Sequence, residues 1–330
     1  MARPRSKIDM TCQNPKCKFF LKEEGKDVIK RGKNRAGHQQ YYCNHCHKWF
    51  VETANTPLYH KHLSKEEVIQ ICKHLVEKNG VRSIERLTGH HRDTISRLLD
   101  DIASHAEMMN DFLLYEVKLG QFEVDELWSF VKKKQKKVKS EISGAAEEGD
   151  IWVYVGLKRG SYLFISFAVG KWTQKTCRLM IDKLYRRVEP PSPNQRIQFF
   201  SDGNDDYEYV LPEFYAETCM DYAQLVKIRE NGRVVDLKKR VVYGSPNVED
   251  IILTDVENFN GILRERIGRL VRKTKCYPKS KTMLSNAVEV IQFYWNFMNP
   301  LYDSMTPGMI ESLTDHVWSW DDFLTHHYAV

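Results

Sequence analysis

The sequence predicts an α+β protein of several domains, with an N-terminal zinc ribbon, then a helix-turn-helix, then a mixed α/β domain. Two cysteine pairs near the N-terminus indicate the ribbon, and a capped helical pattern broken by a glycine-containing turn indicates the helix-turn-helix. Beyond residue 115, strand-like apolar runs alternate with a helical pattern, which is typical of a mixed sheet flanked by helices. We place the boundaries at 1–60, 61–112 and 113–300, with a C-terminal tail at 301–330.

Length and charge narrow the class of protein. A chain of 330 residues is long enough for two or three domains, and its net charge of +6 permits a polyanionic partner without proving one. The chain has no run of 18 apolar residues and no apolar N-terminal signal segment, so we expect a cytoplasmic protein with no membrane partner. Four of its eight cysteines cluster at the start, which indicates metal binding in a reducing compartment.

The first region contains Cys12 and Cys17, then Cys43 and Cys46. Each pair is spaced for a tight turn, so four thiolates can complete the tetrahedral shell of Zn²⁺. So short a segment cannot form a stable core without such a metal. Lys33 and Arg35 lie in a basic turn between the pairs. They favour phosphate contact as a second role, although a purely structural ribbon remains the alternative.

The second region reads as helical throughout. Ser64 and Glu67 form a capping box, and an apolar stripe then continues to Asn79-Gly80. A short helix at 81–87, a turn around Gly89 and a further helix from residue 92 match the helix-turn-helix pattern, whose second helix enters the major groove. The alternative is an ordinary three-helix module. The candidate DNA-contacting residues are His91, Arg92, Thr94, Ser96 and Arg97.

The third region carries the candidate chemistry. We expect strands at 120–131, 151–157, 162–169 and 195–203 and a helix at 173–188. The first strand has Phe122 and Val124 on one side and Asp125 exposed near its middle, and the last strand delivers Asp202 at its tip. A lysine-rich run from 132 to 140 follows the first strand. Its members Lys132, Lys133 and Lys134 fit either a loop over a phosphate backbone or an ordinary solvated loop.

A helical pattern at 255–270 brings a third carboxylate. Its apolar residues recur every three or four positions, and Glu257, Asn260 and Arg264 fall together along the flank of that stripe. Asp125, Asp202 and Glu257 repel one another if they converge, unless a cation neutralises them, and hard oxygen ligands favour Mg²⁺ or Mn²⁺. Paired divalent ions can clamp both oxygens of a phosphoryl transfer. The alternative is a core helix whose charges are simply solvated.

Two residues on this helix have expected supporting roles. Arg264 could steady phosphate charge, and Asn260 could orient Glu257 or contact a DNA backbone. Downstream, apolar residues at helical spacing predict a packing helix at 280–297, ended by Asn299-Pro300. The tail at 301–330 is expected to dock on the preceding domain or on a partner chain.

The residues at 124–130, 201–203, 256–264 and 269–274 resemble transposases of the insertion-sequence-one family, which are of the DDE type. The stretch 36–46 and the helix-turn-helix are similar to the zinc finger and DNA-binding region of that family. The resemblance implies a ribonuclease-H-like fold for the third region. It places Asp125, Asp202 and Glu257 at the catalytic triad positions and matches Asn260 and Arg264 to accessory positions.

The resemblance also implies an activity. It would be metal-dependent hydrolysis at transposon ends, followed by attack of the freed 3′ hydroxyl on target DNA, with at least a dimer joining two ends. Catalytic Mg²⁺ or Mn²⁺, structural Zn²⁺ and a nucleoid-associated location in a prokaryotic host would follow. The chain departs from the family in encoding both parts in one reading frame and in its longer lysine-rich run. A non-catalytic DNA-binding regulator and a structure-specific nuclease remain the alternatives.

Overall fold

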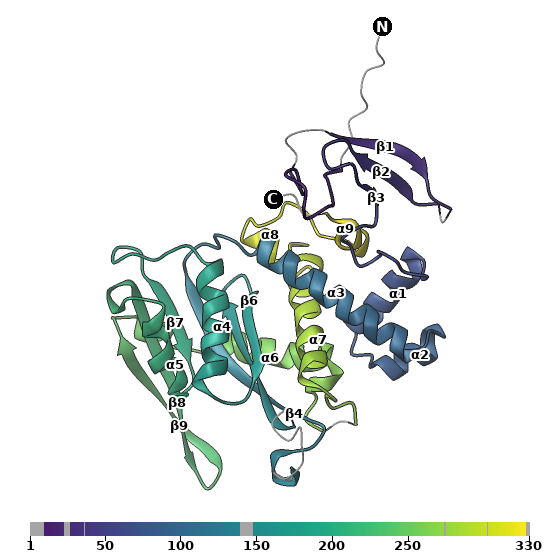
Figure 1. The fold of residues 1–330 in the computed structure, drawn as a ribbon. Coiled ribbons are helices and arrows are strands. Elements are labelled where there is room, and N and C mark those ends of the chain that lie inside the picture. The colour runs from purple at the N-terminus through teal and green to yellow at the C-terminus, as the bar shows by residue number, and fades with distance from the viewer. Residues whose placement is uncertain are drawn as a thin grey trace. The chain divides into compact units, whose positions relative to one another are not determined.

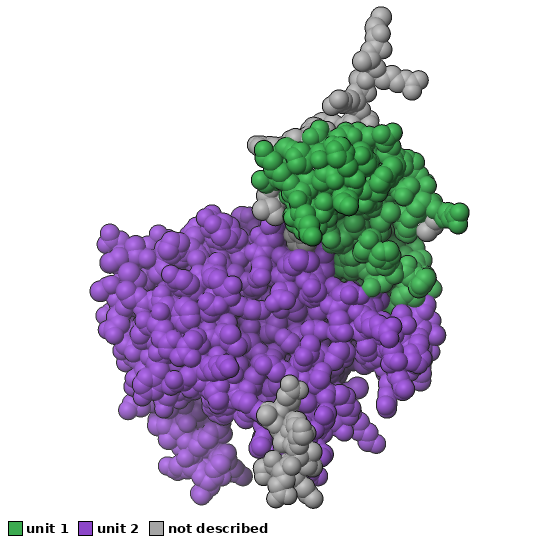
Figure 2. All heavy atoms as spheres, viewed as in Figure 1, with its two compact units in different colours: residues 1–72, 318–330 green, residues 73–317 purple. Residues whose placement is uncertain are grey.

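The computed structural model describes residues 10–22, 27–35, 37–138, 148–273, 275–301 and 303–327. The chain forms two compact units (Figure 2). Unit 1 contains Met1–Cys72 and Trp318–Val330, and unit 2 contains Lys73–Val317. The last residues of the chain therefore group with the cysteine-rich region. Within the described residues, no helix is both long enough and apolar enough to cross a bilayer.

Unit 1 is built on a small antiparallel sheet. Its strands are β1 (Val28–Lys33), β2 (Gln39–Cys43) and β3 (Trp49–Val51). The buried core consists of three of the cysteines together with Val28 and Tyr41. A core this small is consistent with the expectation that a metal supplies much of the stability. The C-terminal α9 (Trp320–Thr325) adds an ion pair in which Lys65 Nζ lies 2.5 Å from Asp321 Oδ1.

The expected helix, turn and helix follow one another in the chain. α1 (Lys65–Leu75) spans the boundary between the units, and α2 (Val81–Thr88) and α3 (Arg92–Leu113) belong to unit 2. Gly89 ends α2 with a φ of 76°, a left-handed conformation that glycine adopts at little cost. α3 has 22 residues and is therefore about 33 Å long at about 1.5 Å per residue. It extends well beyond the short recognition helix that the sequence pattern required.

Unit 2 contains a mixed sheet, as the sequence predicted, and this sheet has six strands (Figure 1). Its strands are β4 (Gln121–Val131), β5 (Gly149–Lys158), β6 (Leu163–Gly170), β7 (Ile197–Ser201), β8 (Met220–Glu230) and β9 (Arg233–Tyr243). They lie in the order β6-β5-β4-β7-β8-β9. β7 is parallel to both of its neighbours, β4 and β8, and the other pairs are antiparallel. The sequence analysis anticipated β4 to β7 but not the β8–β9 hairpin.

Helices cover both faces of this sheet. α4 (Gln174–Arg187) packs on one face, where a Cβ added to Gly156 would meet Met180 and Leu184. α6 (Thr254–Arg266) packs on the other face, to which Glu123 of β4 points. The helix predicted at 255–270 ends at Arg266, before the expected residue, and a separate turn, η6 (Gly268–Leu270), follows it. The remaining short elements are η1 (Gln135–Lys137), α5 (Asp206–Val210), η3 (Leu211–Glu213), η4 (Glu217–Cys219), η5 (Val248–Asp250) and α8 (Pro307–Ile310).

α7 (Lys281–Phe293) and the π-helical turn η7 (Tyr294–Met298) cover the outer edge of β6. The Asn296 amide donates to the Phe164 carbonyl at 2.9 Å and accepts from the Phe164 N–H at 2.9 Å. Gln292 donates to the same carbonyl at 2.7 Å, and Trp295 donates to the Tyr162 carbonyl at 2.8 Å. An edge strand with unpaired backbone groups can pair with another chain, and these side chains satisfy those groups instead.

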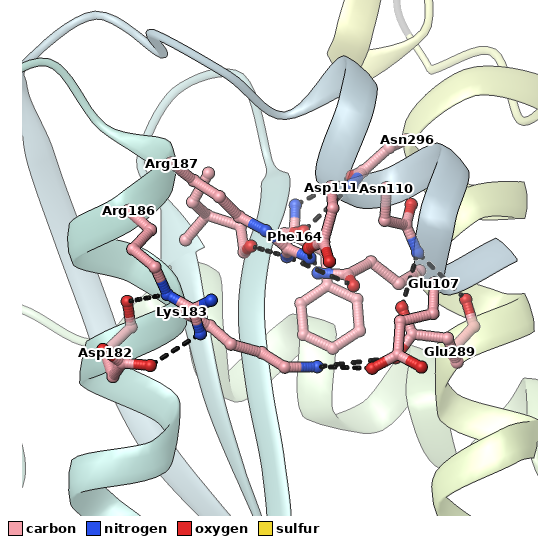
Figure 3. Close-up of polar contacts among 12 residues, drawn as sticks. Glu107, Asn110, Asp111, Phe164, Asp182, Lys183, Arg186, Arg187, Glu289 and Asn296 are labelled. Atoms are coloured by element: carbon pink, nitrogen blue, oxygen red, sulfur yellow. Dashed lines mark hydrogen bonds and ion pairs between the residues drawn. The ribbon is translucent and has the colours of Figure 1, made fainter. Parts of the chain in front are cut away.

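The C-terminal half of α3 is tied to the sheet by buried polar contacts (Figure 3). Asn110 donates to Glu289 of α7 at 2.8 Å. Arg187 of α4 donates to Asp111 at 2.6 Å and to the Ile165 carbonyl at 2.6 Å. α3 thus joins the helix-turn-helix to the layer that covers β6, which explains why both belong to unit 2.

Candidate metal centres and active site

The four N-terminal cysteines converge in unit 1. Their sulfur atoms all lie within 4.8 Å of one another. Cys12 Sγ is 3.7 Å from Cys46 Sγ, and Cys17 Sγ is 4.0 Å from Cys43 Sγ, so the sulfurs are too far apart for disulfide bonds of about 2.05 Å. His45 Nδ1 lies 3.5 Å from Cys17 Sγ, beside the cluster. Four convergent thiols are a donor set that Zn²⁺ accepts, so the residues fit the predicted ion.

The surroundings of three of the thiols shift their pKa in different directions. Burial acts to raise the pKa of Cys46, but hydrogen bonds from the Asn14 side chain and the Lys48 backbone lower that pKa to about 7. Burial raises the pKa of Cys12 and of Cys17. Without a cation, the raised pKa keeps Cys12 and Cys17 in the thiol form at neutral pH. A bound cation favours the thiolate form of all four, because metal ligation requires the deprotonated sulfur.

In unit 2, β4 and β7 place two of the predicted carboxylates side by side. β7 ends at Ser201, which is opposite Val124 of β4, so Asp125 and Asp202 are the next residues on the two parallel chains. A third carboxylate belongs to Glu126. One oxygen from each of Asp125, Glu126 and Asp202 lies within 4.8 Å of the other two. This arrangement offers a divalent cation three oxygen ligands.

Crowding and burial shift the titration of this carboxylate group. Burial, and then the charge of Asp202, raise the pKa of Asp125 to about 6 and that of Glu126 to about 8. Burial also raises the pKa of Asp202, against a backbone hydrogen bond from Asn204 that lowers it. A divalent cation could replace the proton that these groups retain near neutral pH. Asp125 is half-buried, so its predicted exposure was wrong, because α6 covers that face of β4.

Glu257, the third predicted carboxylate, lies outside the group of three. It is on the exposed side of α6 and accepts a hydrogen bond from Lys227 of β8. Its charge still raises the pKa of both Asp125 and Asp202, so it is an electrostatic neighbour of the group. Sequence reasoning overlooked Glu126, because successive strand residues point to opposite faces and only Asp125 was assigned to the site. Two adjacent acidic residues inside an apolar strand were the available signal.

α6 contributes two further residues. The Asn260 amide is buried and donates to Asp125 Oδ2 at 2.6 Å. Asn260 was expected to orient Glu257 or contact DNA, and here it holds Asp125 instead. One turn later, the half-buried Arg264 has a pKa lowered by burial and by the nearby Arg272. Its Nε is buried and makes no hydrogen bond within the described part of the chain.

A buried ion pair fixes the start of α6 against β4. Glu123 is fully buried, its Oε1 accepts from Arg159 Nε at 2.8 Å, and Arg159 Nη2 lies 2.7 Å from the same oxygen as part of the ion pair. Its Oε2 accepts from the Val256 N–H at 2.9 Å. The step from Glu123 to Asp125 covers about 6.7 Å of strand, and the step from Val256 to Asn260 covers about 6 Å of helix. Because these spacings match, the Glu123–Val256 and Asp125–Asn260 contacts can form together. Glu123 therefore positions the helix that holds Asp125.

The predicted DNA-contacting residues of α3 lie at its N-terminus. His91 caps the helix by accepting from the Asp93 N–H. Asp93 Oδ2 also lies 3.6 Å from His91 Nδ1, so one acidic side chain lies among the basic ones. Arg92, Thr94 and Arg97 are exposed and Ser96 is half-buried. Most of these side chains are accessible to a partner.

The other predicted phosphate contacts lie in exposed turns. Lys33 is the last residue of β1 and Arg35 lies between β1 and β2, and both are exposed. Lys132, Lys133 and Lys134 are exposed after β4, where Lys132 Nζ pairs with Glu148 at 2.9 Å and Lys134 Nζ lies 5.4 Å from the centre of the Trp128 ring. Ala36, Lys139, Ser140 and Thr274, which belong to the motifs and the lysine-rich run, lie outside the described residues.

Comparisons with known proteins add little to this geometry. No protein family model matches the chain. Among solved structures, the chain is similar to one in a crystal structure of the Mos1 strand transfer complex, at 9% sequence identity and a TM-score of 0.25. The similarity covers 71% of this chain and 77% of that chain. At this score and identity, the similarity supports no assignment of fold or function.

Proposed function

We propose that this chain is a DDE transposase that binds the terminal inverted repeats of its element and catalyses divalent-metal-dependent DNA cleavage and strand transfer. The observation that carries the proposal is the convergence of Asp125, Asp202 and Glu126 at the end of β7, beside a helix that supplies Asn260 and Arg264. The mixed sheet agrees with the ribonuclease-H-like fold that the sequence resemblance implies. The convergent thiols and the exposed N-terminus of α3 agree with the two DNA-binding regions.

Each residue has a role in this proposal. Asp125, Asp202 and Glu126 would hold Mg²⁺ or Mn²⁺, and Glu257 would join them after release from Lys227. The bound ion would activate the attacking oxygen and stabilise the leaving oxygen. Asn260 keeps the Asp125 carboxylate in place through its 2.6 Å hydrogen bond.

Other residues would serve DNA binding. The half-buried Arg264 would contact a DNA phosphate through its guanidinium group. The four cysteines would hold a structural Zn²⁺, which stabilises the turn that carries Lys33 and Arg35. The N-terminal residues of α3 would contact the element ends, and the lysines after β4 would contact phosphates. Because two ends must be joined, the reaction requires at least a dimer.

The replacement Asp125→Asn tests the proposal. It keeps the side chain's size and removes its charge, so we expect the variant to bind end DNA and to lose Mn²⁺-dependent nicking of a supercoiled plasmid that carries both element ends. Asp205→Asn is the matched control, since Asp205 is an exposed carboxylate shortly after Asp202 and outside the group. Gel-shift and plasmid-nicking assays measure the two properties.

The outcomes separate this proposal from its alternatives. Retained nicking by Asp125→Asn would remove Asp125 from the mechanism. End binding by the wild-type protein without any cleavage would favour the non-catalytic regulator. Cleavage that depends on branched DNA structure and not on the end sequence would favour the structure-specific nuclease.

A further inference from the structure

The β8–β9 hairpin extends beyond the rest of the sheet (Figure 1). β8 pairs with β7 only from Met220 to Gln224, and beyond that point it pairs with β9 alone. The turn between them is Asn231-Gly232, and both residues have positive φ, 50° and 77°, as in the tight turns that match the twist of paired strands. Residues 225–239 therefore form a two-stranded projection, which we call the arm together with the adjoining Arg240.

The surface of the arm combines exposed apolar side chains with an excess of basic residues. Two-stranded hairpins are only marginally stable alone in water, yet large apolar side chains of this hairpin are exposed, with Val235 at 52% and Leu237 at 51%. Its charge is also unbalanced. The basic residues from 227 to 240 are Lys227, Arg229, Arg233, Lys238, Lys239 and Arg240, against the acidic Glu230 and Asp236.

Three of these basic side chains are available to a partner. Arg229, Arg233 and Lys238 are exposed and make no side-chain hydrogen bond or ion pair with any described residue. The others are engaged within unit 2, because Lys239 donates to the Val248 carbonyl and Arg240 pairs with Glu208. Exposed apolar side chains with unpaired cations nearby are typical of a binding surface for a polyanion.

The arm is continuous with the carboxylate group. At its base, Lys227 pairs with Glu257, and its charge lowers the pKa of both Asp125 and Asp202. Leu237 is directly opposite Lys227, and Arg229 is two residues further out on the same strand, so both share the face of Lys227. One face of the arm, with Arg229, therefore leads outward from the candidate active site, and the opposite face carries Arg233 and Lys238.

We infer that the arm binds duplex DNA beside the scissile phosphate and holds it through phosphate contacts from Arg229, Arg233 and Lys238. This inference rests on the proposed function and names a surface that the sequence analysis did not. A two-stranded β-ribbon fits the major groove of B-DNA, and the cations match the charge of the backbone. A second copy of the chain is a poorer occupant, because β9 forms the sheet edge with three successive basic residues that repel an identical edge.

The test compares two triple variants of the full chain. The arm variant carries Arg229→Gln, Arg233→Gln and Lys238→Gln. The control variant carries Lys118→Gln, Lys175→Gln and Arg186→Gln, which removes the same charge from exposed positions elsewhere in unit 2. Fluorescence anisotropy with a labelled duplex oligonucleotide gives the binding constant over a range of NaCl concentrations.

The salt dependence provides the decisive readout. Each phosphate contact contributes about 0.9 to the slope of log K against log salt, so we expect the arm variant to lose about 2 to 3 in slope. The control variant should keep the wild-type slope. Circular dichroism melting confirms that both variants are folded, which is expected because all three arm side chains are exposed and unpaired.

Three results would overturn the inference in distinguishable ways. Equal slopes for the arm variant and the control variant would remove DNA contact from the arm while leaving the proposed function intact. A change in sedimentation coefficient with no change in slope would assign the arm to contact between copies of the chain. Failure of the wild-type protein to bind duplex DNA would refute the proposed function together with the arm.

Discussion

Replacing Glu123 with glutamine should weaken the fold and, through it, the carboxylate group. Glu123 is 0% exposed and accepts two N–H bonds, one from Arg159 Nε and one from Val256 at the start of α6, and Arg159 Nη2 completes the ion pair. Glutamine keeps the size of the side chain but removes the charge. Its NH₂ group would also face N–H donors in place of an accepting oxygen. The Asp125–Asn260 contact lies one helical turn further along the same strand–helix pair, so it should loosen as well.

The size of the expected decrease in the free energy of unfolding depends on how well the remaining charge of Arg159 is compensated. Removing one partner of a buried ion pair costs about 3–5 kcal/mol, since the other charge is left uncompensated. Arg159 keeps hydrogen bonds to the Gln121 side chain and to the carbonyls of Asp250 and Ile252, and its guanidinium lies 4.6 Å from the Phe200 ring centre. These contacts reduce the loss, so we expect a decrease of about 2–4 kcal/mol in the free energy of unfolding.

Urea denaturation followed by tryptophan fluorescence measures this decrease in the free energy of unfolding. Calorimetric titration with Mn²⁺ measures the affinity of the carboxylate group for the ion, which should be weaker in the variant. Glu249→Gln, an exposed change in η5 near the same loop, is the control and should alter neither quantity. Glu123→Leu combined with Arg159→Met should be less destabilised than the two single changes together, because no buried charge is left alone. A Glu123→Gln protein within about 0.5 kcal/mol of wild type would refute the reasoning.

Two other predictions concern the metal centres. Cys43→Ser should reduce the bound Zn²⁺ measured by atomic absorption and expose unit 1 to proteolysis, since four sulfurs share one small core; unchanged zinc content would remove Cys43 as a ligand. Without divalent ions, unfolding free energy should fall as pH rises from about 4.5 to 8. Burial raises the pKa of Glu126 from its ordinary value of 4.5 to about 8 in the folded state. The folded state therefore binds more protons than the unfolded state between these two pH values. Glu126→Gln should flatten this dependence, and an unchanged pH profile of Tm would contradict it.

The sequence predicted the parts of the fold that follow a local pattern. Alternating and continuous apolar runs located β4, β5, β6 and β7, and the position of Asp202 at the end of β7 placed it beside Asp125. Cysteine spacing alone located the thiol cluster, because the tetrahedral shell of Zn²⁺ requires four donors from two turns. These features depend on residues that are close together in the chain or on a ligand set of fixed number.

The remaining features depend on tertiary contacts. β9 has no buried side chain, so no apolar pattern marked it as a strand, and its pairing with β8 comes from a turn of two residues. The pairing of Glu257 with Lys227 joins a helix to a strand that had not been predicted. Glu126 points to the other face of β4 from Asp125, yet one of its oxygens lies within 4.8 Å of those of Asp125 and Asp202, just beyond the end of β7. Strand periodicity alone gave no reason to expect this.

Because α3 is one continuous helix, it would link DNA recognition to the carboxylate group. Its exposed N-terminal residues are the expected DNA contacts, and its C-terminal residues Asn110 and Asp111 bind Glu289 of α7 and Arg187 of α4. α7 in turn covers the edge of β6, in the same sheet as Asp125. The predicted contacts of α3 and the carboxylate group therefore belong to one packed unit. DNA bound at the N-terminus of α3 would lie at a fixed distance from Asp125, so disrupting the Asn110–Glu289 contact should impair cleavage more than binding.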